Sequence, residues 1–578
     1  MKKILLAILI STCYNSLAQM ASKNHFETIF EASKGTKTAT YEQVIQFYSD
    51  LANAHKAIDI QEIGKTDSGK PLHLVTFNPD SDFNFKTIRK NKRVILINNG
   101  IHPGESDGID ATMMLFRDLV NGRINPPKHL VLTTIPIYNI GGSLNRNSTT
   151  RTNQNGPEEY GFRGNARNYD LNRDFIKCDT ENAKSFAQIF HLVQPDIFVD
   201  NHVSNGADYQ YKITHLFTQH DKLGGDLGDY LQNVMQPAIE RSMLEKGLPM
   251  TPYVNVFNQV PEKGFSQFLD SPRYSTGYTT LFNTLGLMVE THMLKPYKER
   301  VYATYELMKS LIDFTENQQV SIAKLRTNYW KTFKTGDRYA LDWTIDSLQQ
   351  TTLDFKGYEG TYETSKITGA KRLKYDRTQP FTKPVEYFNH FKAKAEITIP
   401  KAYVVPQGWH DVIDLLKLNN ISMTRFKTDT TLTVASYKIV SYDTKNMPYE
   451  GHYQHYNTKV KANTENKTFK AGDYMIDTHQ PGIRYLLETL EPEGPDSFFN
   501  WNFFDTILQQ KEHFSPYVWE DKVLELMQAN PKLKTDFEAK KFNDQAFANN
   551  WYAQLDWWHK HSKYYEKAHM QYPVYRIR

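Results

Sequence analysis

The sequence of 578 residues predicts an α/β fold in its first half, with a mixed, mostly parallel sheet covered by helices on both faces, followed by an α+β C-terminal region. Short apolar runs alternate with amphipathic helical segments in the first half, which is the pattern of strand–helix–strand units. From about Asn328 onward short β-type runs replace this alternation, and a Trp-rich helical tail follows from about residue 500. The chain is too long for one ordinary core, so we expect two or more domains.

The first half is predicted to begin with a β-hairpin. The segment Glu62 to Phe77 contains most of a phosphate-binding loop pattern, but Pro71 replaces the required Ser or Thr and a strand-like run follows, so a Gly-rich hairpin turn is the better interpretation. The elements expected after it are strand 93–97, helix 106–120, strand 130–137, helix 181–192, strand 196–200, helix 221–245, strand 286–290 and helix 298–317. A polar stretch from Gly141 to Asp174 interrupts them, and a loop of this length inside a compact domain is usually functional.

The C-terminal half is expected to be β-rich before the helical tail. Strands are predicted at 339–345, 395–399 and 432–440, a β-α-β piece at 402–426, and an extended hairpin or loop at 443–472. The tail tryptophans could form a carbohydrate-binding surface, but core packing is the better interpretation because Trp usually buries most of its surface. The three expected parts are a signal peptide at 1–18, an α/β domain at 25–320 and an accessory region at 328–578.

The N-terminus predicts export. Lys2 and Lys3 precede an apolar run and small residues that end at Ala18, which is the pattern of a secretory signal peptide. A lipid attachment at Cys13 is the alternative, although Thr12 is a poor residue before such a cysteine. No later apolar run is long enough for a transmembrane helix, so we expect a periplasmic or secreted protein.

The charge distribution indicates the kind of partner. The net charge of +4 is spread without long basic runs, which gives no indication of nucleic-acid binding. A peptide or another small molecule is therefore the expected partner, and the sequence predicts no oligomeric state.

Ligand-type side chains follow two of the predicted strands. His102 and Glu105 come after strand 93–97 across a Pro-Gly turn, and His202 stands at the carboxyl end of the apolar strand that begins at Asp196. In open α/β sheets ligands bind beyond the carboxyl ends of the strands, so these three side chains are expected to meet. Two His and one Glu are an established set for catalytic zinc, which needs three protein ligands and one open position. The sequence therefore predicts one zinc ion per chain.

Four motifs in this order resemble those of a known family. His102-Pro-Gly-Glu105, the later His202, the run from Tyr169 to Arg173 (Tyr-Asp-Leu-Asn-Arg) and the segment Leu-Met-Val-Glu290-Thr-His resemble the zinc carboxypeptidase family, the M14 metallopeptidases. The likeness covers about residues 40 to 315, and the C-terminal half looks like the extension found on some bacterial members. The resemblance implies a zinc carboxypeptidase fold and a metallocarboxypeptidase that releases C-terminal amino acids from peptides.

The resemblance also implies roles for individual residues. Glu290 matches the general base that activates water, and a carboxylate at the end of a strand can take this proton. Asn172 and Arg173 match the pair that binds a substrate's terminal carboxylate, for which a planar guanidinium is well suited. Asp170 matches the carboxylate that orients a zinc-binding histidine.

Two assignments stay open. Arg151, Arg163 and Arg167 compete for the role of the arginine that stabilises the oxyanion, and Arg151 is chosen because it follows an Asn- and Thr-rich loop as the family's arginine follows its own. Tyr274 and Tyr278 are both candidates for the mobile tyrosine that precedes the general base, and Tyr274 is the one assigned to substrate binding.

Two other functions are considered. Relatives of the family are zinc amidases that act on cell-wall peptides or N-acyl amino acids, and such a reaction would use the same metal site. A non-catalytic peptide-binding module would keep the fold without activity, but His102, Glu105, His202 and Glu290 are all present, which disfavours it.

Overall fold

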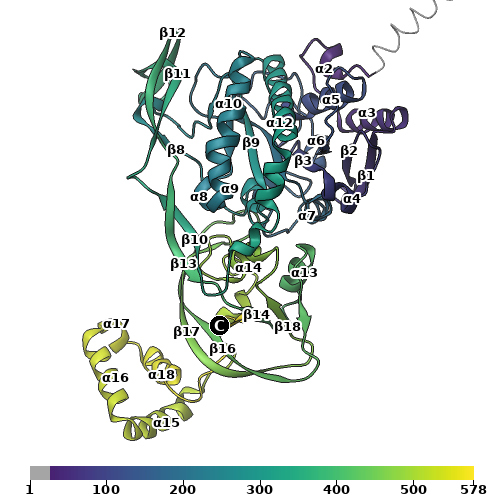
Figure 1. Ribbon diagram of the computed structural model, residues 1–578. Helices are drawn as coiled ribbons and strands as arrows, with labels where there is room; N and C mark the ends of the chain where they lie inside the picture. Colours follow the sequence, from purple (N-terminus) through teal and green to yellow (C-terminus); the bar gives the residue numbers. More distant parts are fainter. Residues whose placement is uncertain (1–25) are drawn as a thin grey trace, which may run out of the picture.

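The computed structural model describes residues 26–578, so the predicted signal peptide at 1–18 lies outside the described residues. Figure 1 shows three parts: a sheet with its helices, a smaller β-rich region beside it, and a helical lobe at the far end. Within the described part of the chain, no helix is both long and apolar enough to cross a membrane.

The N-terminal region is organised around an eight-stranded mixed sheet. Its strand order is β1-β2-β4-β3-β5-β9-β6-β7, and β4, β3, β5 and β9 run parallel at its centre. The strands are β1 (Ile58–Lys65), β2 (Pro71–Phe77), β3 (Arg93–Asn98), β4 (Leu130–Ile135), β5 (Ile197–Ser204), β6 (Ile213–Phe217), β7 (Met250–Pro252) and β9 (Leu285–His292). Every residue of β4 and β5 is buried, as expected for strands covered on both faces.

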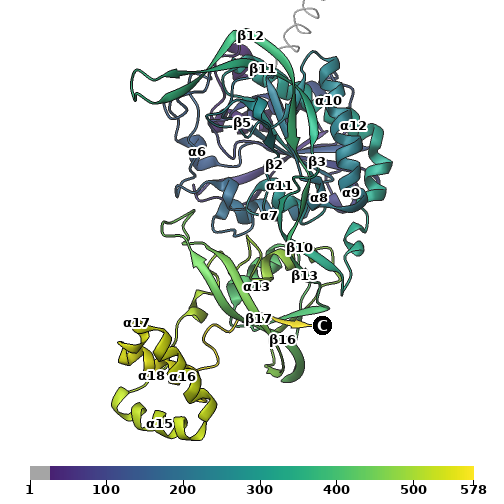
Figure 2. The ribbon, with the colours of Figure 1, turned by 90° about the vertical axis from the view of Figure 1, so that its left-hand side faces the viewer.

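Helices lie on both faces of this sheet (Figure 2). On one face α5 (Asp107–Val120) packs against α12 (Tyr297–Arg326), and these helices contact β3, β4, β5 and β9. On the other face α7 (Glu181–Val193) contacts β1 and β2, and α11 (Ser275–Thr280) contacts β5 and β9. Thr180 caps α7 by accepting the Ala183 N–H. The predicted α/β fold class is confirmed.

The helix predicted at 221–245 is wrong as a single element. The chain forms α8 (His220–Leu223), α9 (Gly225–Tyr230), one π-helical turn and α10 (Gln236–Glu245). Gly224 and Gly225 have φ angles of 81° and 47°, so both adopt left-handed backbone conformations that end the first turn and redirect the chain.

Strands β5 and β9 extend further than the apolar runs predicted. Strand β5 continues through Asn201 and His202 to Ser204, and β9 continues past Glu290 to His292. The prediction relied on apolar residues. It therefore missed the ends of these strands, where polar residues of the functional site lie. His202 and Glu290 therefore lie within their strands and not at the last positions.

The C-terminal region contains a smaller sheet and two long hairpins. Its six-stranded sheet has the order β15-β18-β14-β19-β16-β17, and β10 pairs with β13. Its elements are β10 (Arg338–Ile345), β11 (Thr351–Thr364), β12 (Lys371–Phe388), β13 (Phe391–Thr398), β14 (Ala402–Val405), α13 (His410–Leu418), β15 (Thr424–Arg425), β16 (Thr430–Thr444), β17 (His455–Phe469), β18 (Tyr474–Asp477), α14 (Ile483–Leu490) and β19 (Tyr575–Ile577). The β11–β12 hairpin was not predicted, since its strands are mostly polar and exposed.

One hydrophobic core crosses the predicted boundary near residue 320. The same cluster of buried side chains extends from the central sheet to Tyr485 and Trp501 of the C-terminal region. The completely buried Arg484 donates hydrogen bonds to the main-chain oxygens of Lys222 and Leu223. Strand β12 also pairs with the short strand β8 (Phe265–Ser266).

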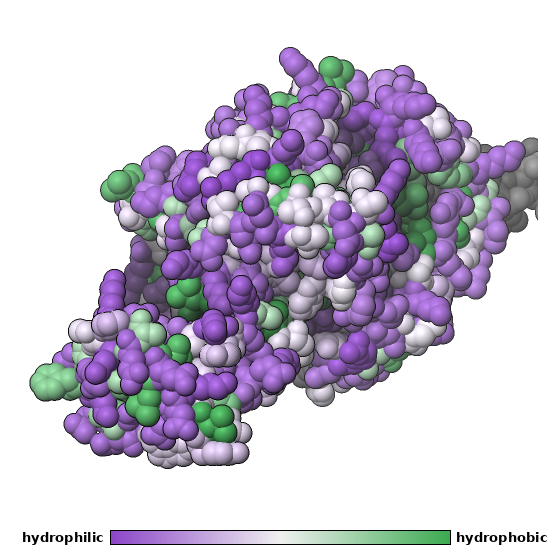
Figure 3. Space-filling view, turned by 90° about the horizontal axis from the view of Figure 1, so that it is seen from below, coloured by the Kyte–Doolittle hydropathy of each residue, from purple (hydrophilic) through white to green (hydrophobic). Residues whose placement is uncertain are grey.

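The helical tail forms a separate lobe with its own small core. Helices α15 (Pro516–Ala529), α16 (Pro531–Asn543), α17 (Gln545–Ala548) and α18 (Trp551–Lys560) enclose Trp519 and Trp558. Trp501 is also buried, whereas Trp551 is exposed. The face in Figure 3 is mostly hydrophilic, with hydrophobic residues scattered over it. Most of these tryptophans thus serve packing.

Candidate metal centre and active site

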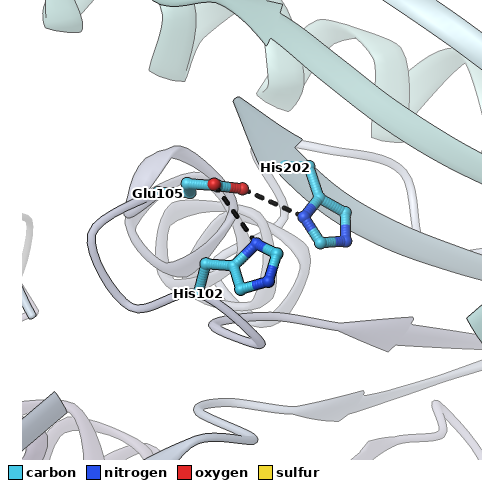
Figure 4. A group of neighbouring side chains, drawn as sticks. All are labelled: His102, Glu105 and His202. Carbon is cyan, nitrogen blue, oxygen red and sulfur yellow. Dashed lines mark hydrogen bonds and ion pairs between the residues drawn. The ribbon is translucent and has the colours of Figure 1, made fainter. Parts of the chain in front are cut away.

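His102, Glu105 and His202 meet at the carboxyl ends of β3 and β5 (Figure 4). His102 and Glu105 lie in the connection between β3 and α5, and His202 projects from the second half of β5. All three side chains are buried, and one ligand-type atom of each lies within 4.8 Å of the others. The parallel arrangement of β3 and β5 therefore brings together residues that are 97 positions apart.

The orientation of these side chains fits a zinc ion. His102 Nδ1 lies 3.2 Å from Glu105 Oε1, and His202 Nδ1 lies 2.9 Å from Glu105 Oε2. Each histidine presents its second ring nitrogen to another carboxylate: His102 Nε2 is 2.9 Å from Asp170 Oδ1, and His202 Nε2 is 2.9 Å from Asp200 Oδ2. A carboxylate that accepts the Nε2 proton leaves Nδ1 free for a metal, which is the usual support of zinc-binding histidines.

Asp200 is a functional residue that the sequence analysis missed. It lies two positions before His202 in β5, and alternate residues of a strand share a face. The completely buried carboxylate also accepts a short hydrogen bond from the Ser275 hydroxyl. An Asp-x-His pattern at the end of a buried strand is the sequence signal that could have identified it.

The charges around the ligands keep the carboxylates ionised. Burial alone would raise the pKa of Glu105, but His102 and Arg151 outweigh this effect and hold it well below its usual value. Burial likewise opposes ionisation of Asp170, yet His102 and Arg163 lower its pKa. Both groups are therefore anionic, as a metal ligand and a partner of a metal-bound imidazole need to be.

Glu290 lies beside the metal centre on the neighbouring strand. In the parallel pairing of β5 and β9 it stands opposite His202, and its half-buried side chain lines the same cavity as the three ligands. Burial raises its pKa to about 8; His202 opposes this shift, while Glu105 contributes to it. A carboxylate with a pKa near neutrality can exchange protons efficiently at physiological pH.

A cavity of about 310 Å³ opens beside the ligands. The predicted site residues that line it are His102, Glu105, Arg163, Asn172, Arg173, His202, Tyr274 and Glu290. Its wall also contains residues that the sequence analysis did not single out, among them Tyr253, Phe257 and Phe268. They carry no motif, and only the folded chain brings them to the site.

The arginines differ in their position relative to the cavity. Arg163 lines the cavity and donates to Asp170 Oδ2 at 2.8 Å, with Glu105 Oε1 3.8 Å from its Nη1. Arg151 donates to Glu105 Oε1 at 2.9 Å but does not line the cavity. Arg167 is exposed and donates to the main-chain oxygen of Asp179. Of these three arginines, Arg163 is the one that lines the cavity.

Tyr274 and Tyr278 are also distinguished by their surroundings. Tyr274 lines the cavity, and the Arg173 guanidinium lies 4.5 Å from the centre of its ring. Tyr278 is completely buried, and its hydroxyl donates to Asn419 Oδ1 at 2.6 Å. Of the two candidates, Tyr274 alone is in contact with the cavity.

The C-terminal region supports the loop that carries the predicted carboxylate-binding pair. Glu450 Oε2 accepts the main-chain N–H of Asp170 at 2.8 Å, and His452 Nε2 lies 2.7 Å from Asp179 Oδ2. Nearer to the cavity, Arg173 Nη1 donates to the main-chain oxygen of Asn172 at 2.8 Å. The loop is thus held from one side by the metal centre and from the other by the accessory region.

Two imidazoles and one carboxylate converge on a single point in this site, and a further carboxylate lies on the adjacent cavity wall. This arrangement defines a zinc-dependent hydrolase. The family model described as zinc carboxypeptidase matches residues 44–200. The match assigns this part of the chain to a zinc carboxypeptidase domain of the M14 type, and the protein is a zinc-dependent peptidase with one catalytic zinc ion.

Similar curated proteins extend over most of the chain. Carboxypeptidase 2 of Trichophyton rubrum is 21% identical over 496 residues, covering 81% of this chain and 84% of that protein. Carboxypeptidase 2 of Trichophyton tonsurans is 21% identical over 494 residues, with the same two coverages. Since 81% of the chain is more than its first 326 residues, the similarity continues into the C-terminal region.

Similar solved structures cover about half of the chain. A metallo-carboxypeptidase from Burkholderia cenocepacia has a TM-score of 0.36 and 16% identity, covering 49% of this chain and 70% of its own. Carboxypeptidase A from Helicoverpa armigera has a TM-score of 0.38 and 12% identity, covering 54% of this chain and 81% of its own.

Proposed function

We propose that this protein is an exported metallocarboxypeptidase that removes single amino acids from the C-termini of peptides. The observation that carries the proposal is the position of Arg173, which lines the same cavity as the metal ligands and Glu290. A guanidinium in the same cavity as the metal ligands can anchor a free carboxylate and so select the last peptide bond of a chain. The export part rests on the predicted signal peptide at 1–18.

His102, Glu105 and His202 would hold the zinc ion, and Asp170 and Asp200 would fix the two imidazole rings. When bound, zinc supplies a Lewis acid that polarises the peptide carbonyl and favours ionisation of water.

Glu290 would act as the general base. It would accept a proton from the attacking water molecule and pass it to the nitrogen of the departing amino acid, so that the peptide C–N bond breaks and an acid and an amine are formed. Its place on the wall of the cavity that contains the three ligands supports this role.

The remaining cavity residues would orient the substrate. Asn172 and Arg173 would bind the terminal carboxylate, with Tyr274 against the guanidinium. Arg163 is our preferred group for neutralising the oxyanion, because its guanidinium faces the cavity while Arg151 is engaged with Glu105 outside it.

The test is a comparison of matched peptides with the mature chain. Each peptide is offered with a free C-terminal carboxylate and as its C-terminal amide, and the products are identified by mass spectrometry. We expect single residues to be released from the free acid and little cleavage of the amide. Equal cleavage of both forms, or faster hydrolysis of peptidoglycan fragments or N-acyl amino acids in the same panel, would instead support the amidase alternative.

A further inference from the structure

A second group of metal-ligand side chains lies outside the catalytic cavity. His220 and Asp221 begin α8, and His390 lies in the turn between β12 and β13. Over residues 26–578, this group and the catalytic set are the two places where three His, Cys or carboxylate ligand atoms lie within 4.8 Å of one another. The group joins two parts of the chain that are 170 residues apart.

The three ligand atoms form one closed triangle. His220 Nε2 is 3.4 Å from His390 Nδ1 and 3.4 Å from Asp221 Oδ2, and His390 Nδ1 is 3.7 Å from the same oxygen. Hydrogen bonds between such atoms are normally about 2.7–3.2 Å long, so all three separations exceed that range. Tetrahedral zinc with bonds of about 2.0–2.1 Å keeps its ligand atoms about 3.3 Å apart. The triangle therefore fits a shared ion better than a set of mutual hydrogen bonds.

Hydrogen bonds fix the Asp221 carboxylate beside the two imidazoles. Its Oδ2 accepts the main-chain N–H of Phe391 at 2.7 Å and the Gln219 side-chain amide at 3.0 Å. Carboxylates that bind metals are usually fixed by such hydrogen bonds. His220 is buried, whereas Asp221 and His390 are about one-quarter exposed, which gives an ion both a dry side and access to water.

We propose that His220, Asp221 and His390 bind a divalent transition-metal ion of the zinc class, in addition to the one catalytic zinc. Two imidazoles and one carboxylate are donors that zinc accepts, with a water molecule as the fourth ligand. The ion joins α8 of the N-terminal region to the β12–β13 turn of the C-terminal region.

The place of this second site suggests its role. Gln267 bridges the same junction, because its N–H donates to the Phe388 oxygen at 3.0 Å and its side chain donates to the Phe217 oxygen at 3.0 Å. The next residues along the chain include Phe268 and Tyr274 of the cavity wall. An ion between α8 and the β12–β13 turn stabilises the junction from which this wall extends.

The decisive measurement uses the full chain with two of its catalytic zinc ligands replaced by alanine. The variant His102→Ala/His202→Ala is stripped with chelator, incubated with Zn²⁺ alone, desalted and analysed for bound metal. We expect about one equivalent to remain, because the second site keeps its three ligands. Adding His390→Ala should remove that equivalent. No retained zinc in the double variant, or equal retention with and without His390, overturns the proposal.

A matched control is provided by His410. It is an exposed histidine followed by Asp411, with His410 Nδ1 2.9 Å from Asp411 Oδ1, and so it reproduces the His-Asp sequence of the second site without a third ligand. His410→Ala in the same background should leave zinc binding unchanged. Loss of zinc in this variant as well would indicate non-specific surface binding and would contradict the proposal.

Two further measurements cover the case in which the double variant does not fold. Native mass spectrometry of the zinc-loaded wild-type chain should show two metal ions, and His390→Ala should show one. Asp221→Asn keeps an acceptor for the Phe391 N–H but loses the negative charge, so the affinity of the second site should fall by about tenfold or more. One ion in both the wild type and His390→Ala overturns the proposal.

Discussion

Arg173→Ala tests whether the cavity recognises the free end of a peptide. The Arg173 guanidinium is about one-fifth exposed, it lies against Tyr274, and its Nη2 is 3.9 Å from Asp170 Oδ2. Removing one partner of a desolvated charge pair costs about 2–5 kcal/mol. Because water and Asp170 already screen this guanidinium in part, we expect about 2–3 kcal/mol. This corresponds to a loss of about 30- to 160-fold in kcat/KM for a free-acid peptide.

The assay follows kcat/KM for one peptide as its free acid and as its amide. The acid should lose most of its advantage in Arg173→Ala, whereas the amide, which offers no carboxylate, should change little. Arg173→Lys should recover part of the loss, since an ammonium group cannot donate two parallel hydrogen bonds. Arg167→Ala is the matched control, because this nearby arginine is exposed and its side chain does not line the cavity. If acid and amide lose equally in Arg173→Ala, this arginine only stabilises its loop and the reasoning is refuted.

Four other substitutions test the metal centre and the charged groups beside it. His202→Ala should lower the zinc content by one equivalent relative to the wild type, because two ligands are too few for a catalytic site; metal analysis that shows no change would exclude His202 as a ligand. Glu290→Gln should keep zinc and fold while kcat falls by about a hundredfold or more, and near-normal turnover would contradict the role of general base. Arg163→Ala should reduce kcat/KM more than Arg151→Ala, because Arg163 faces the cavity; the opposite order in steady-state kinetics would favour Arg151.

The convergence of the metal ligands could be predicted because it depends on sheet topology. Strands β3 and β5 are short, apolar and parallel neighbours, so side chains near their carboxyl ends must lie close together whatever the intervening chain does. The Pro-Gly turn between His102 and Glu105 is a local feature, so it could also be predicted from the sequence. Glu290 follows from the same argument, since β9 is the next strand in the sheet.

Features that depend on irregular backbone could not be predicted in this way. Arg151 and Arg163 both lie in the long loop between α6 (Ile140–Leu144) and α7, and no periodicity indicates which side chain turns inward. The second metal-ligand group could not be predicted from the sequence either, because only the fold brings His390 in the β12–β13 turn next to α8. The polar β11–β12 hairpin lacks the apolar alternation by which strands are recognised.

The hydrogen bond from the Asp170 main chain to Glu450 limits which amino-acid sequences the two halves of the protein can combine. Asp170, whose carboxylate lies 2.9 Å from His102 Nε2, is itself held by a residue 280 positions later in the chain. A substitution in the C-terminal half can therefore alter catalysis although it lies outside the metal site. If the first half is replaced by that of a relative, the residue at position 170 no longer has the residue at position 450 with which it evolved. The two halves should therefore be exchanged together. A chimeric protein needs the loop at residue 170 and the loop at residue 450 from the same parent.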